Sequence, residues 1–157
     1  MKQITLAVNS KQVTTEVEDH WTLLDFLREK LDITGPKKGC EAGECGACTV
    51  LMNGSPVSSC LILAAQADGS EIITAEGLAK DGKLDPLQQA FIDNHAIQCG
   101  FCTPGFIITL KGLLNENPNP TEQEIKEALV GNLCRCGCYP AIIEAALATV
   151  KGSERKQ

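Results

Sequence analysis

Apolar and polar residues alternate along residues 4–8 and again along residues 13–17, with a polar Asn-Ser pair between the two runs. This alternation predicts two strands joined as a β-hairpin. Residues 49–58 repeat the arrangement on a shorter scale, with an Asn-Gly pair at the centre. Because Asn-Gly favours the tightest hairpin turns, we predict a second hairpin there.

The spacing of apolar residues becomes helical between the two hairpins. Thr22 and Asp25 form a capping box ahead of leucines at helical spacing, which predicts a short helix over residues 22–31. Residues 61–67 are predicted to form another short helix, and residues 71–74 a final strand. Together these elements predict a compact α+β domain over residues 1–76.

The pattern after residue 76 is helical throughout. Asp85 before Pro86 marks one helix start, and apolar faces at helical spacing also follow Pro104, Thr121 and Pro140. We therefore predict a second domain, residues 77–157, built as a four-helix bundle.

Composition and charge narrow the class of protein. The chain has 157 residues, of which 43% are hydrophobic and 22% charged, as expected for a folded protein. Its net charge of −6 argues against a nucleic-acid partner. Residues 1–10 lack the continuous apolar run of a secretion signal, and no stretch is long enough for a membrane span. We therefore expect a cytoplasmic protein, whose cysteines serve as metal ligands rather than disulfides.

Four of the nine cysteines follow the spacing C-x4-C-x2-C-x11-C. The first three match the plant-type [2Fe–2S] ferredoxin loop, and glycines between them allow the loop to wrap a cluster. A zinc site and a redox dithiol are the alternatives, but structural zinc favours two paired knuckles, which this spacing fits poorly. The predicted ligands of a first cluster are Cys40, Cys45, Cys48 and Cys60.

A second set of cysteines follows the pattern C-x2-C…C-x-C. On spacing alone it is ambiguous between a second cluster, zinc and a thioredoxin-like dithiol, although no βαβ pattern surrounds it. Cysteines two residues apart in an extended turn lie on one side of the chain, where both can reach one iron. The predicted ligands of a second cluster are Cys99, Cys102, Cys134 and Cys136.

Three strings, residues 39–50, 98–105 and 131–136, strongly resemble the [2Fe–2S] subunit or domain of the xanthine dehydrogenase family of molybdenum hydroxylases. The resemblance implies a β-grasp ferredoxin domain and a four-helix domain, with one cluster each. It implies a large molybdopterin-binding partner subunit and a medium FAD-binding one. Electrons would pass from molybdenum through the helical-domain cluster, then the ferredoxin-domain cluster, to FAD or another acceptor.

The resemblance also places two residues beside the pterin. Gln98 and Cys136 match the family's positions there, so Cys136 is implied both as a ligand and as a pterin contact. The family has C-T-G-Y after its last ligand, whereas this chain has a ninth cysteine, Cys138, before Tyr139. We expect Cys138 to be a small buried residue. A role as an alternative ligand or a redox-sensitive thiol stays open.

The sequence has no phosphate-binding glycine loop. Its 157 residues, already divided between the two predicted domains, leave no room for a pterin or flavin domain. The chain therefore holds and positions redox groups, while substrate is oxidised on a partner. Purines, other N-heterocycles, aldehydes, aromatic acyl-CoA thioesters and carbon monoxide are all candidate substrates. The alternatives are a free-standing two-cluster ferredoxin and a cysteine-rich zinc protein.

Overall fold

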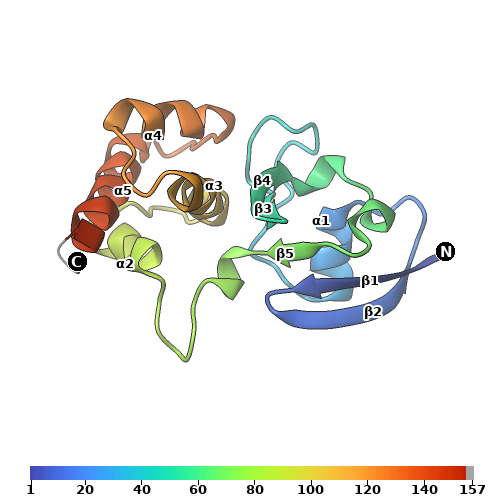
Figure 1. Cartoon of the computed structure of the whole chain (residues 1–157). Coiled ribbons are helices and arrows are strands. Elements are labelled where there is room, and N and C mark those ends of the chain that lie inside the picture. The colour runs from blue at the N-terminus through green and yellow to red at the C-terminus, as the bar shows by residue number, and fades with distance from the viewer. Residues whose placement is uncertain (155–157) are drawn as a thin grey trace.

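The computed structural model of the chain describes residues 1–154. It is an α+β structure, with a sheet formed by the first half of the chain and helices by the second (Figure 1). The last three residues of the predicted second domain, 155–157, lie outside the described part. Among residues 1–154, no helix combines the length and apolar composition needed to cross a membrane.

The sheet is mixed and has the strand order β2-β1-β5-β3-β4. Both predicted hairpins are confirmed, because β1 pairs antiparallel with β2 and β3 pairs antiparallel with β4. The central strand β5 runs parallel to β1 and antiparallel to β3. The strands are β1 (Lys2–Val8), β2 (Lys11–Val17), β3 (Thr49–Met52), β4 (Ser55–Ser58) and β5 (Glu71–Ile73).

A short helix packs on this sheet where residues 22–31 predicted one. The capping box is present, since the Thr22 side chain accepts from the Asp25 N–H and the Asp25 carboxylate accepts from the Thr22 N–H. The helix starts as α1 (Leu23–Asp25) and continues as a wider π-helical turn, Phe26–Lys30. Its leucine and phenylalanine side chains join those of β1 and β5 in one buried core.

The prediction of one helix over residues 61–67 is wrong. The chain forms two 3-10 turns instead, Ser59–Leu61 and Ala64–Ala67. Between them Ile62 and Leu63 are extended, and the Ile62 carbonyl accepts a 2.7 Å hydrogen bond from the Leu23 N–H. This pairing with the start of α1 gives the Ile62 carbonyl the hydrogen-bond partner that a continuous helix would have supplied.

Four α-helices follow, each starting within one residue of its predicted start. Asp85 and Thr121 form capping boxes at the first and third, and Pro104 lies in the first turn of the second. Their apolar faces share a second buried core that centres on Phe91, Phe106 and Ile142. The helices are α2 (Pro86–Asp93), α3 (Thr103–Glu116), α4 (Glu122–Ala128) and α5 (Tyr139–Glu154).

The two halves meet along α3. Figure 1 shows α3 beside β3 and β4, and it contacts both strands. A Cβ atom on Gly112 of α3 would collide with the ring of Pro56 in β4, so the close approach requires glycine. Leu51 of β3 belongs to the core of the helical half, which makes the contact partly apolar.

Candidate metal centres

The loop before β3 folds around the Cys40 thiol. The backbone N–H groups of Ala42, Glu44 and Cys45 each donate to Cys40 Sγ at 3.3 Å. These three donors lower the pKa of Cys40 to about 6, because they stabilise the thiolate. Gly43 supplies the positive φ that the wrap requires. The loop is therefore built to hold a negatively charged sulfur.

Two of the four predicted ligands of the first centre have thiols that lie inside the protein. Cys48 and Cys60 are 3% and 8% exposed and pack against Leu24. Their thiols interact directly with each other, as do those of Cys40 and Cys45. Burial, followed by the neighbouring Cys48, raises the pKa of Cys60 to about 11. The four predicted ligands thus come together as an outer pair and an inner pair.

The second centre lies where two turns meet, one before α3 and one before α5. Cys102 and Cys134 are half-buried and their thiols contact each other, whereas Cys99 and Cys136 are exposed. Burial and then the Cys134 thiol raise the pKa of Cys102 to about 12. Burial opposes ionisation of Cys134, but the N–H of Cys138 donates to its sulfur at 3.4 Å and the net effect lowers its pKa.

This arrangement fits two-iron clusters. Among residues 1–154, no three His, Cys, Asp or Glu side chains gather around one point as ligands of a single metal ion. The thiols gather in pairs instead, and a [2Fe–2S] cluster takes two protein ligands on each iron. Backbone N–H donors to the sulfurs add the outer interactions that stabilise such a charged group. When bound, such clusters would supply electron transfer, and the cysteines and backbone N–H groups described here would supply the thiolates and hydrogen bonds.

Gln98 and Cys136 lie together in the structure. The Gln98 side chain donates to the Cys136 carbonyl at 3.4 Å, and both residues are exposed. Ile97, Phe101 and Leu133 are large apolar side chains that are also exposed. All five belong to the turns that carry the second centre, so this centre borders a partly apolar surface.

Tyr139 is a structural residue of the second centre that the sequence alone did not reveal. Its hydroxyl accepts from the Cys134 N–H at 2.9 Å and donates to the Asn132 carbonyl at 3.2 Å. Its ring packs edge-on against Phe106, with centroids 5.7 Å apart. The only sequence signal was its place directly after the cysteine motif. Tyr139 therefore fixes the shape of the turn that presents Cys134.

Tyr139→Phe is expected to destabilise the helical half by about 1–3 kcal/mol, because the N–H of Cys134 and the carbonyl of Asn132 lose their partner. Denaturant unfolding of the iron-loaded chain measures the loss, and chelator challenge should release iron faster from the second centre. Phe91→Leu, also in the helical core but remote from the turn, is the control for packing alone. Iron release equal to that control would contradict the role of the hydroxyl.

The two centres are joined by backbone contacts. The Leu133 N–H donates to the Cys45 carbonyl at 2.9 Å, and the side chain of Asn132, 3% exposed, donates to the Gly46 carbonyl at 3.4 Å. A Cβ on Gly105 of α3 would collide with the same Gly46 carbonyl. The loop of the first centre is thus held directly against the turn of the second, which the sequence did not predict.

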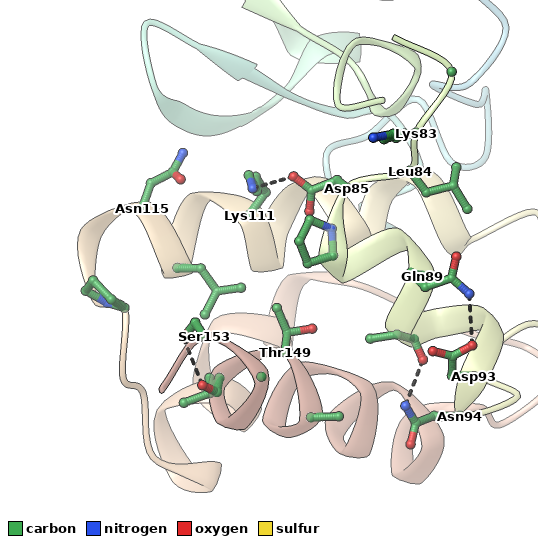
Figure 2. Close-up of a pocket in the computed structure, with 18 residues that line it drawn as sticks. Lys83, Leu84, Asp85, Gln89, Asp93, Asn94, Lys111, Asn115, Thr149 and Ser153 are labelled. Atoms are coloured by element: carbon green, nitrogen blue, oxygen red, sulfur yellow. Dashed lines mark hydrogen bonds and ion pairs between the residues drawn. The ribbon is translucent and has the colours of Figure 1, made fainter. Parts of the chain in front are cut away.

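One cavity of the described chain lies away from both centres. It measures about 880 Å³ and opens between α2, α3 and the end of α5 (Figure 2). Lys111 and Asp85 form a 2.6 Å ion pair across its wall. No cysteine is among the described residues that line it, so this cavity is separate from the metal chemistry.

Comparisons with known proteins agree with this geometry. Residues 6–79 match the family model of the 2Fe-2S iron-sulfur cluster binding domain, and residues 74–147 match that of the [2Fe-2S] binding domain. The small FeS subunit of nicotinate dehydrogenase from Eubacterium barkeri is 54% identical over 136 residues, which cover 87% of each chain.

Solved structures share the fold. Quinoline 2-oxidoreductase from Pseudomonas putida 86 has a chain that is 46% identical, with a TM-score of 0.93 over 98% of this chain and 96% of that one. Aldehyde oxidoreductase from Desulfovibrio gigas is 37% identical with a TM-score of 0.94, covering 100% of this chain but 18% of its own. The chain therefore belongs to the iron–sulfur small subunits of the xanthine dehydrogenase family of molybdenum hydroxylases, which carry electrons on two [2Fe–2S] clusters within larger oxidoreductase complexes.

Proposed function

We propose that each centre holds one [2Fe–2S] cluster on the four cysteines predicted for it. The observation that carries this proposal is the pairing of thiols, Cys40 with Cys45, Cys48 with Cys60, and Cys102 with Cys134. Two thiolates for each iron is what such a cluster requires. Cys99 and Cys136 complete the second set, and both lie on the same two turns as the pair they join.

The second centre faces the large molybdopterin-binding subunit in this proposal. Gln98 and Cys136 contact the pterin, which their mutual hydrogen bond and their exposure support. Three exposed apolar side chains then become buried against that partner subunit, those of Ile97, Phe101 and Leu133. Apolar groups grouped on a protein surface commonly mark such interaction sites. Electrons enter the chain at this surface.

Electrons leave through the first centre, to a medium FAD-binding subunit or another acceptor. Cys40 and its neighbours Glu41 and Glu44 are exposed on the loop, which gives an acceptor access to this cluster. The division into a β-grasp ferredoxin domain, residues 1–76, and a four-helix bundle, 77–157, belongs to the same proposal. A cytoplasmic location does too, and it is supported by the lack of a disulfide bond among the nine cysteines, all of which the structure describes.

The substrate of the complex is chosen elsewhere. The relatives named above are subunits or chains of a nicotinate dehydrogenase, a quinoline oxidoreductase and an aldehyde oxidoreductase, yet they share this fold. One electron-carrying unit therefore serves different substrates. We propose that the partner subunit that binds molybdopterin also sets the substrate, and that this chain contributes no group to the bond that is oxidised.

Anaerobic native isolation of the chain from its source cells tests the proposal. Native mass and metal analysis should find larger partner chains, molybdenum and about four irons for each copy of this chain. Flavin in the same complex would support the FAD-binding partner. Recovery of the chain alone, with its iron but without molybdenum, would contradict the placement in a hydroxylase complex. Zinc in place of iron would contradict the cluster assignment itself.

A further inference from the structure

The segment that leads into the first centre, residues 34–37, is held by the side chain of Arg28. One guanidinium nitrogen, Nη1, donates to the Thr34 carbonyl at 2.9 Å and to the Pro36 carbonyl at 2.8 Å. Arg28 lies on the π-helical turn after α1, whose apolar side chains are buried in the core of the sheet-forming half. The guanidinium therefore ties the segment to that core.

Two positive charges contact the backbone of this segment. A guanidinium is always charged in proteins. The Lys37 ammonium donates to the Thr34 carbonyl at 2.5 Å and to the Gly35 carbonyl at 3.1 Å. Among residues 1–154, neither Arg28 nor Lys37 forms an ion pair with a carboxylate, whereas the next residue, Lys38, pairs with two. The charges of Arg28 and Lys37 are therefore directed at the peptide groups that they contact.

One peptide group carries the interaction onward to a cluster ligand. It joins Pro36 to Lys37: its carbonyl accepts from Arg28, and its N–H donates to the Ala47 carbonyl at 2.9 Å. A carbonyl that accepts from a cation makes the N–H of the same peptide group a stronger donor. The N–H of Ala47 in turn donates to Cys45 Sγ at 3.4 Å. Arg28 thus acts, through Ala47, on a donor to a predicted ligand sulfur.

The guanidinium occupies this place although one of its donors is unpaired. Its Nε atom is buried, and in the described part of the chain it has no hydrogen-bond partner. An unpaired donor that is shielded from water lowers the stability of the folded state. That cost is not expected of a side chain that serves packing alone, so the charged group itself is what the site uses.

We propose that Arg28 is a positioning residue of the first centre: it holds Ala47 in place to donate to Cys45 Sγ, and its charge raises the reduction potential of the first cluster. Reduction adds negative charge, so a positive charge and a firmly held N–H donor both favour the reduced state. The inference rests on the ligand set and the direction of electron flow proposed above. In that direction, Arg28 favours transfer from the second cluster to the first.

Redox titration followed by electron paramagnetic resonance tests the proposal on the iron-loaded chain, isolated with its co-purifying partners. Arg28→Met removes the charge and both hydrogen bonds but should keep about four irons. Its first cluster should be about tenfold harder to reduce, a shift of roughly 59 mV for one electron, while the second cluster is unchanged. Arg28→Lys keeps the charge on a shorter side chain and should show a smaller shift in the same direction.

Leu27→Val is the matched control for packing, because Leu27 is the buried neighbour of Arg28 on the same turn. It should shift the potential of neither cluster. Hydrogen–deuterium exchange gives a second measurement that does not depend on the potential. The backbone amides of residues 37–47 should exchange faster in Arg28→Met than in the unchanged chain, and no faster in Leu27→Val.

Two results would overturn the inference while leaving the ligand set intact. One is full iron content in Arg28→Met with an unchanged potential of the first cluster, and the other is an equal shift in Arg28→Met and Leu27→Val. Should Arg28→Met fail to retain iron, Arg28→Lys decides, and an unchanged potential there would overturn the inference as well. Zinc in place of iron in the unchanged chain would instead mean that the proposed ligand set itself fails.

Discussion

Gly46→Ala is expected to destabilise the chain by about 2–5 kcal/mol and to loosen the contact between the two centres. Gly46 has φ +72°, a conformation that costs an L-residue about 1–2 kcal/mol. The added methyl would also collide with the Gly131 carbonyl and the Asn132 side chain, and such overpacking costs about 1–3 kcal/mol more. Denaturant unfolding of the iron-loaded chain measures the sum.

Gly82→Ala is the matched control for this substitution. Gly82 has the same φ of +72°, but a Cβ there would meet no atom within 4 Å. Gly82→Ala should therefore show only the conformational cost of about 1–2 kcal/mol. The difference between the two variants isolates the collision at the contact. Equal losses of stability would mean that the loop and the turn separate without strain.

Cys45→Ser is expected to remove the first cluster and leave the second. About two of the four irons should be lost, together with the ferredoxin-type spectral signal, because an iron would lose one of its thiolates. The second cluster should persist, since its ligands lie on turns anchored in a separate helical core. The Cys45 carbonyl that contacts Leu133 is backbone, so the substitution leaves that bond in place. Iron analysis and low-temperature paramagnetic resonance of the purified chain measure both effects.

The reciprocal variant, Cys102→Ser, should remove the second signal and preserve the first. The inner pair of the first centre, Cys48 and Cys60, packs with Leu24 and does not depend on the helical half. Loss of both signals in either variant would show that neither centre assembles without the other. The predicted division at residue 76 would then not separate two units that fold independently.

Features set by local interactions were predictable from the sequence. The two hairpins follow from alternation and an Asn-Gly turn, and the capping boxes at Thr22, Asp85 and Thr121 mark helix starts correctly. Each of these features depends on residues close together in the chain, so the local sequence pattern is enough to predict it. The grouping of cysteines was predictable as well, because three of the four in the first set lie on one short loop.

Features set by distant contacts were not predictable. The helix expected over residues 61–67 is broken because Ile62 pairs with Leu23, almost 40 positions earlier in the chain. The roles of Asn132 and Tyr139 depend on partners that only the fold brings near them. Neither residue stands out by type or spacing. Cys138 was expected to be buried, and it is, but its contact with Cys134 became visible only with the structure.

The bond between Leu133 and Cys45 has a consequence for the timing of electron passage. Domains joined by small polar interfaces usually move relative to each other, and a carrier built that way must wait for a favourable orientation. Here the loop and the turn are locked by backbone hydrogen bonding and by the close fit of Gly46 against Gly105. In the proposed complex, transfer between the clusters would need no hinge opening or closing, so conformational gating would arise only where partner subunits dock.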